Sequence, residues 1–227
     1  MKRSEINREI LHAIDFLDHH SFTLPPFADW SPQQWEQVGP EANEIRSRQL
    51  GWDVTDFNRG RFRELGLTIF TIRNGKVDDP ANRKVYAEKV LIVKEQQITP
   101  YHFHFSKTED IINRGGGKLL IQVCNSDDQQ SLADTPVTVS CDGVERTVPA
   151  GGTIELETGQ SITLVPGVYH EFTAAAGSGT VLVGEVSSVN DDNIDNRFLQ
   201  ELPRFPIIDQ DEPPVRLLCT EYPEAKH

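Results

Sequence analysis

Short apolar runs separated by turn signals fill the chain from about residue 65 onward, and they constrain its fold more than any other feature. The runs are rich in β-branched and aromatic residues and lie at 67–72, 89–93, 101–105, 118–124, 137–141, 153–156, 161–165 and 181–186. Turn signals such as Asp142-Gly143 and Pro166-Gly167 separate them. Many short strands without helical periodicity between them are typical of an all-β barrel or sandwich.

Two different segments flank this strand-rich region. Apolar residues at helical spacing predict a first helix, with Ser4 as its N-cap: Ile6, Ile10, Ala13, Ile14 and Leu17. Ser31-Pro32 predicts a second, short helix through Trp35. An acidic loop and a Pro-rich tail end the chain. We therefore expect one domain made of a helical segment (1–64), a β-barrel (65–189) and a loop with a tail that wraps the barrel (190–227).

The charge balance excludes several classes of function. The chain has 35 acidic and 22 basic side chains and a net charge of -13, which repels nucleic acids and anionic membranes. Its apolar runs are too short to span a bilayer, and its first residues lack the apolar stretch of a secretory signal. Three widely spaced cysteines argue against a disulfide framework. These features predict a soluble cytoplasmic protein with neither nucleic-acid nor membrane partners.

Three histidines fall within the strand-rich region. His102 and His104 alternate, so on a strand both imidazoles point to one face, and Glu109 follows five residues later. With His170 they make a set of three imidazoles and one carboxylate, which suits a divalent metal such as Mn, Fe, Ni or Zn. The lack of a neighbouring thiolate disfavours a structural zinc site. Four ligands on an octahedral ion would leave two positions for substrate oxygens.

The same residues carry a resemblance to the cupins. The run from His102 through Glu109 to Gly116 resembles the first cupin motif. Gly159 and the run from Pro166 to His170 resemble the second, although here the Pro and Gly are adjacent. The resemblance implies a mainly β cupin fold, a double-stranded β-helix or jelly-roll-like barrel, with an N-terminal helical extension. It also implies that His102, His104, Glu109 and His170 bind one divalent metal per subunit.

Two longer segments, 97–111 and 185–198, resemble the cupin-type D-lyxose isomerases, and the similarity extends across most of the chain. That resemblance implies reversible conversion of D-lyxose to D-xylulose and of D-mannose to D-fructose. It implies Mn2+ as the metal, with Zn2+, Fe2+, Co2+ or Ni2+ as alternatives. By analogy with the family we expect a homodimer that acts on a free aldose or ketose.

Such an isomerase would move a proton through a cis-enediol on a metal-chelated sugar, and it needs a base and an oxygen donor. Glu185 shares strand parity with Val181 and Val183, and we take it as the base. Lys107 lies between the His pair and Glu109 and is the second catalytic candidate. For both residues, a solvated surface position is the alternative.

Three further residues are candidates for binding the sugar. Lys94 alternates with Val90 and Ile92, which could place it in the barrel lumen. Asp195 and Arg197 lie in the acidic loop, where the forked donors of Arg197 suit sugar hydroxyls. An exposed position for Lys94 and a structural ion pair for Arg197 are the alternatives.

Two other functions use the same kind of site. An iron-dependent cupin dioxygenase would have the same ligand set, and a non-catalytic cupin could bind sugar without turnover. A phosphosugar substrate is disfavoured, because Lys107, Arg114 and Lys118 are the only basic residues near the first motif in sequence.

Overall fold

The computed structural model describes residues 1–76, 84–189 and 191–225. Its helices are α1 (Arg3–His19), α2 (Pro32–Trp35) and α3 (Asn43–Ser47), with short 3-10 helices η1 (Pro26–Asp29) and η2 (Pro40–Ala42). Its strands are β1 (Gly51–Thr55), β2 (Leu67–Arg73), β3 (Tyr86–Val93), β4 (Thr99–His104), β5 (Glu109–Gly116), β6 (Leu119–Asn125), β7 (Val137–Cys141), β8 (Val144–Val148), β9 (Gly152–Leu156), β10 (Ser161–Leu164), β11 (Val168–Ala174), β12 (Val181–Ser188) and β13 (Asn196–Phe198). None of the helices formed by the described residues is long and apolar enough to cross a bilayer.

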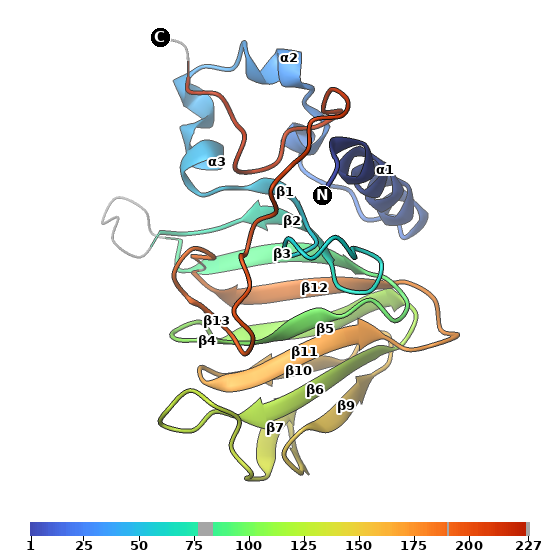
Figure 1. Cartoon of the computed structure of the whole chain (residues 1–227), viewed down its shortest axis with the longest axis vertical. Helices are drawn as coiled ribbons and strands as arrows, with labels where there is room; N and C mark the ends of the chain where they lie inside the picture. Colours follow the sequence, from blue (N-terminus) through green and yellow to red (C-terminus); the bar gives the residue numbers. More distant parts are fainter. Residues whose placement is uncertain (77–83, 190, 226–227) are drawn as a thin grey trace.

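The strands form two antiparallel sheets that enclose an apolar core. The larger sheet has the order β1-β2-β3-β12-β5-β10-β7-β8, and the smaller sheet has the order β13-β4-β11-β6-β9 (Figure 1). Both sheets contribute to the core: Leu91, Ile111 and Val183 come from the larger one, and Ile121 and Phe172 from the smaller one. Burial of one face of each sheet against the other stabilises this arrangement, and it confirms the prediction of an all-β barrel or sandwich.

Helix α1 lies on the outer face of the larger sheet. Its apolar stripe, which includes Ile6, Ile10 and Leu17, packs against residues such as Val54 and Phe70 of β1 and β2. Figure 1 shows the helices gathered at the β1 end of the molecule, with the C-terminal tail running beside them. The apolar spacing of this segment therefore predicted both the helix and the face that it buries.

The tail is fastened to α1 by polar contacts. Buried Arg3 forms an ion pair with Glu221, and Asn7 Nδ2 donates to Glu212 Oε1 at 2.6 Å. The prediction that Ser4 caps the helix is wrong, because α1 begins at Arg3 and the Ser4 hydroxyl donates to Asp211 Oδ2 instead.

The predicted N-cap Ser31 of α2 is confirmed, since its side chain accepts a hydrogen bond from the backbone N–H of Gln34.

The larger sheet begins earlier than the sequence indicated. Strand β1 lies within the range 1–64 that we expected to be helical, and it pairs with β2 from Gly51 opposite Thr71 to Thr55 opposite Leu67. All five of its residues are buried: Trp52 and Val54 pack in the cluster with α1, and Asp53 and Thr55 on the other face contact Arg204 of the C-terminal segment. Trp52 to Thr55 alternate between apolar and polar residues, a strand pattern that was missed inside the segment assigned to helices. The division of the chain into three segments stays a prediction.

Candidate metal centre

The smaller sheet places three histidines together inside the barrel. Strands β4 and β11 are neighbours in the smaller sheet, with His102 directly opposite His170, and His104 lies two residues further along β4. Nitrogen atoms of the three rings lie within 4.8 Å of one another. The HxH alternation and the β4–β11 register therefore create one cluster from segments about seventy residues apart in sequence.

The hydrogen bonds of the ring nitrogens show which nitrogen of each imidazole is free to bind a ligand. The Nδ1 atoms of His102 and His170 lie 2.7 Å from Pro100 O and 3.0 Å from Val168 O, so each Nδ1–H donates to a carbonyl and Nε2 keeps its lone pair. The buried Nε2 atoms of His104 and His170 have no hydrogen-bond partner of suitable geometry among the described residues. Buried polar atoms without partners are uncommon, and a divalent metal is the group that this donor set fits.

The protonation state of the cluster also suits a metal. Burial holds the pKa of His102 well below its ordinary value, and the neighbouring His170 and His104 lower it further. Burial lowers the pKa of His104 as well, with a second contribution from the Lys107 ammonium. Both rings are therefore neutral at neutral pH, which is the form that binds a metal.

A row of charged side chains adjoins the histidines. Glu109 begins β5, with Oε1 at 3.1 Å from His170 Nε2 and 3.4 Å from His104 Nε2. Its Oε2 lies 2.6 Å from Lys107 Nζ, which also donates to Glu185 Oε1 at 2.9 Å. Burial alone would raise the pKa of Glu109, but Lys107 and then His104 bring it well below the ordinary value, so this carboxylate is ionised.

The acid–base character of Lys107 follows from the same pairs. Burial alone would lower the pKa of Lys107, but Glu109 and Glu185 together raise it above the ordinary lysine value. Lys107 is therefore a protonated hydrogen-bond donor at neutral pH. The structure places Glu109, Lys107 and Glu185 beside the histidines, as expected from sequence, while their roles stay predictions.

A small cavity of about 40 Å³ connects these groups. Its lining combines the charged side chains with apolar ones, and includes Leu91, Phe172 and Phe198 beside His102, Glu109 and Glu185. Concave sites that mix apolar walls with a few converging polar groups are the usual setting for small-molecule chemistry.

Lys94 is a correction to the expected site. Val90 and Ile92 belong to the cluster that packs against α1, whereas Leu91 and Val93 face the barrel core. The parity argument therefore placed Lys94 on the wrong side: its ammonium forms an ion pair with Glu9 of α1 and lies 5.5 Å from the Phe62 ring centroid. Both faces of β3 are apolar because both are covered, so sequence parity could not distinguish lumen from outer face.

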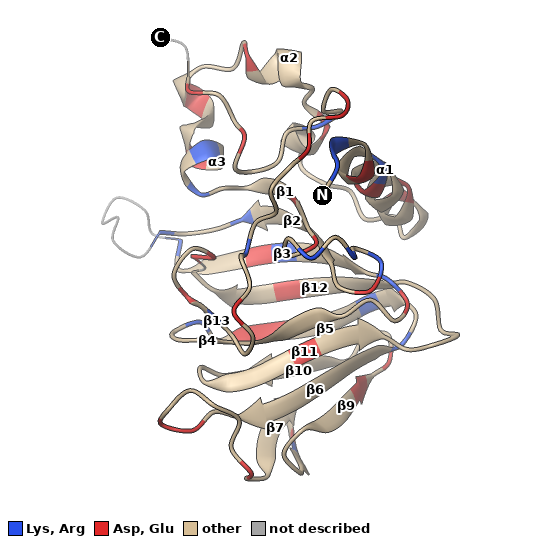
Figure 2. Cartoon of the chain, in the orientation of Figure 1, with Lys and Arg blue, Asp and Glu red and all other residues tan. Residues whose placement is uncertain are grey.

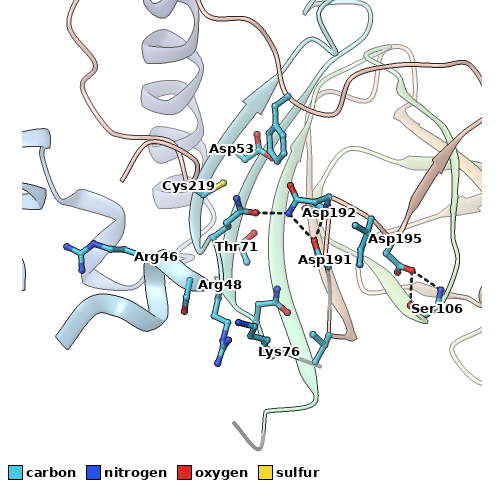
Figure 3. Close-up of a pocket in the computed structure, with 18 of the residues that line it drawn as sticks. Arg46, Arg48, Asp53, Thr71, Lys76, Ser106, Asp191, Asp192, Asp195 and Cys219 are labelled. Atoms are coloured by element: carbon cyan, nitrogen blue, oxygen red, sulfur yellow. Dashed lines mark hydrogen bonds between the residues drawn. The ribbon is translucent and has the colours of Figure 1, made fainter. Parts of the chain in front are cut away.

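Arg197 and Asp195 also differ from expectation. Arg197 lies opposite Phe103 in the β13–β4 pair, on the face away from the histidines, and its Nε donates to Gln130 Oε1 at 3.1 Å. Asp195 accepts a hydrogen bond from the Ser106 hydroxyl at 2.7 Å (Figure 3). It also accepts one from the Lys107 backbone N–H at 3.1 Å. Asp195 therefore fixes the turn that carries Lys107 and does not face the cavity.

Sequence reasoning missed three charged residues of the cavity wall: Lys89, Asp192 and Arg204. Lys89 Nζ lies 3.4 Å from Glu185 Oε1 and 3.6 Å from Asp192 Oδ2, and Arg204 Nη2 lies 3.5 Å from the same Asp192 oxygen. Figure 2 shows acidic segments on the adjacent strands β12 and β5. Lys89 could have been found by assuming the opposite parity for β3, but nothing in the sequence places Asp192 or Arg204 beside it.

The lowered pKa values of His102 and His104 predict that the metal-free protein loses stability in acid. As the pH falls below about 6.5, the unfolded chain binds protons on these rings while the folded chain does not. We expect the free energy of unfolding to fall by about 1.4 kcal/mol per pH unit and ring until the folded-state pKa is reached. Urea unfolding between pH 7.5 and 5.5 measures this slope.

A matched pair of variants checks the cause of that slope. His102→Gln should remove the contribution of one ring and so reduce the slope, whereas the same change at His12, an exposed histidine of α1, should leave it unchanged. An unaltered slope in the His102 variant would contradict the assignment.

Comparisons with known proteins agree in family and in fold. A sequence model described as D-lyxose isomerase matches residues 1–222. The D-lyxose/D-mannose isomerases of Escherichia coli O157:H7 and Serratia proteamaculans are 51% and 48% identical to the chain, each over 98% of both sequences. The crystal structure of Acinetobacter sp. DL28 L-ribose isomerase in complex with L-ribose aligns with a TM-score of 0.60 at 15% identity, covering 92% of this chain and 98% of that one. This likeness concerns the fold alone, and it confirms the mainly β cupin fold with a helical N-terminal extension.

Proposed function

Because the chain belongs to the D-lyxose isomerase family and is therefore an aldose–ketose isomerase, we propose that it converts D-lyxose to D-xylulose with a metal bound at the histidine cluster. D-mannose to D-fructose is the second reaction of the proposal, in line with the names of the two relatives. Membership in this family places the chain among isomerases rather than cupin dioxygenases or non-catalytic sugar-binding cupins.

One observation carries the proposal for the site. Neutral imidazoles with free lone pairs and the Lys107–Glu185 pair line the same cavity. Aldose–ketose exchange moves a proton between C1 and C2. It needs positive charge beside the O1 and O2 oxygens and a base beside C2. The cavity brings both requirements together.

His102, His104, His170 and Glu109 are the proposed metal ligands. A divalent ion held by them would supply positive charge that stabilises the negative charge developing on the sugar oxygens. The ionised Glu109 adds the anionic ligand that balances part of this charge.

Glu185 and Lys107 are the proposed acid–base pair. The Glu185 carboxylate, which is buried and lines the cavity, takes the proton from C2 and returns it at C1 of the cis-enediol. Lys107 cannot be the base, because Glu109 and Glu185 raise its pKa and keep it protonated despite its burial. Its ammonium donates a hydrogen bond to the sugar oxygen on which charge develops.

The native metal, the assembly and the compartment complete the proposal. The mixed nitrogen and oxygen ligand set supports Mn2+, although it suits other first-row ions as well. A homodimer is supported by strand β8, which ends the larger sheet with exposed residues such as Val144 and leaves an edge that a second copy could cover. Three free, buried cysteines support a reducing compartment such as the cytoplasm.

Metal removal tests the proposed function directly. Protein stripped by a chelator should form no D-xylulose from D-lyxose, and Mn2+ should restore turnover, because the charge beside O1 and O2 is missing without it. Ketose formation is followed on D-lyxose, D-mannose, D-xylose and mannose 6-phosphate. Undiminished turnover by protein shown to contain no metal would contradict the proposal, as would a preference for the phosphorylated sugar.

A further inference from the structure

We propose that Arg204 determines which sugars this site accepts, by donating a hydrogen bond from Nη1 to the C4 hydroxyl of the substrate. The inference rests on the proposed function, since it assumes that the sugar's C1 end lies at the metal centre. It assigns a specificity-determining role to a residue of the C-terminal segment that the sequence did not single out.

The hydrogen bonding of Arg204 leaves one donor group unused. Its side chain is 11% exposed, and Nη2 lies 2.5 Å from Asp53 Oδ2 and 3.5 Å from Asp192 Oδ2. Nη1 is also buried, yet it has no hydrogen-bond partner among the described residues. A guanidinium that is fixed on one side and unpaired on the other is a preorganised donor for a ligand oxygen.

A series of ion pairs runs along the cavity wall. Arg204 is its last member, at the end away from the metal ligands. The series runs from Glu109 through Lys107, Glu185, Lys89 and Asp192 to Arg204, and all six members line the cavity. A sugar whose O1 and O2 lie at the histidines directs its remaining carbons along this wall. The hydroxyls beyond C2 are therefore the ones that Arg204 can meet.

Beyond Arg204 lies a larger hollow of about 790 Å³. Asp53 and Asp192 lie on its wall, as Figure 3 shows, and Asp192 lines the inner cavity as well. The inner cavity has room for only a few water molecules. The Asp53–Arg204–Asp192 bridge forms part of the wall between the two spaces and holds the guanidinium in place.

The chemistry of the substrates indicates which hydroxyl must be recognised. D-lyxose and D-mannose have the same configuration at C2, C3 and C4 and differ only beyond C4. L-ribose differs from D-lyxose only at C4. An enzyme that accepts the first two must tolerate changes beyond C4, and it can reject L-ribose only by sensing C4. A site built to hydrogen-bond a hydroxyl discriminates strongly against a substrate that lacks it or misplaces it.

The test pairs Arg204 variants with substrates changed at C4. The wild type is expected to favour D-lyxose over its 4-deoxy analogue and over L-ribose by about 10- to 100-fold in kcat/KM, the range for a hydrogen bond from a charged donor. In Arg204→Met this preference should fall to less than about threefold, since the donor is gone. Arg59→Met is the matched control, because Arg59 also binds the tail, at Glu201 O, but is exposed, and it should keep the preference.

The outcomes separate this inference from the proposed function. If Arg204→Met lowers turnover of D-lyxose and of the 4-deoxy analogue equally, Arg204 only supports the fold and the inference is overturned. The inference is also overturned if the wild type does not distinguish D-lyxose from its 4-deoxy analogue. If the Met variant does not fold, Arg204→Lys, which keeps the charge facing Asp53 and Asp192, carries the test with the same expected loss of preference. A wild type inactive on D-lyxose would overturn the proposed function and the inference with it.

Discussion

Replacing His104 by Ala is expected to abolish metal binding and isomerase activity together. His104 Nε2 lies 3.4 Å from Glu109 Oε1, and the ring centroids of His104 and His170 are 5.5 Å apart. The ring nitrogens of His104 have no hydrogen-bond partner of suitable geometry among the described residues. Loss of a group that only supports a metal ligand costs about 10- to 100-fold in affinity, so loss of the proposed ligand should cost more than about 100-fold. Metal content after dialysis and ketose formation from D-lyxose measure the two effects.

The matched control is His12→Ala, the same chemical change at an exposed position on α1. It should retain both metal and turnover. The His104 variant should remain folded when no metal is present, because it removes buried nitrogens that have no partner. An active His104→Ala enzyme that contains no metal would contradict the proposed role of the cluster.

Most of the fold could be predicted from local patterns. Runs of β-branched and aromatic residues separated by Gly and Pro turns identified β2, β3, β4, β6, β7, β9, β10 and β12. Other strands were missed. Strand β1 was missed inside the segment assigned to helices, although Trp52 to Thr55 alternate between apolar and polar residues, and β8 is mostly exposed and does not alternate. Strand β8 pairs with the strand before it, β7, across the Asp142-Gly143 turn.

The candidate site divides in the same way. The cluster of His102, His104 and His170 could be expected from strand alternation and motif spacing, because two of these residues share one strand. Lys89 could be found only by choosing the correct inward face of β3, and Arg204 could not be found, since its position depends on where the tail crosses the barrel. The error at Lys94 has the same cause: two apolar faces make the parity of β3 ambiguous.

The arrangement also explains why so many charges can be buried together. Glu109, Lys107, Glu185, Lys89, Asp192 and Arg204 alternate in sign, and every adjacent pair lies within 3.6 Å. Burying an isolated charge is costly, whereas a paired charge recovers part of the lost hydration through its neighbours. Removal of one member therefore affects its neighbours, and a test of any single role needs a substitution that preserves shape and hydrogen bonding.

Glu185→Gln is such a substitution, and we expect it to remove turnover while leaving the metal bound. The amide keeps the size of the side chain, and its oxygen can still accept from Lys107, whose Nζ lies 2.9 Å from Glu185 Oε1 in the wild type. The amide cannot take a proton from C2. General acid–base catalysis contributes about 10²- to 10⁴-fold, so kcat on D-lyxose should fall by that range with little change in KM. Exchange of the C2 proton with solvent should stop in the same proportion.

Glu171→Gln supplies the control for this prediction. Glu171 follows the third histidine on β11 but points to the other face of the strand, and the amide there should leave kcat and metal content unchanged. If Glu185→Gln retains normal turnover, another group takes the C2 proton. If it loses the metal together with activity, Glu185 acts on the ligands through Lys107 and Glu109, because that ion-pair series is the contact between them. Retained metal with lost proton exchange is the result that only a base at Glu185 produces.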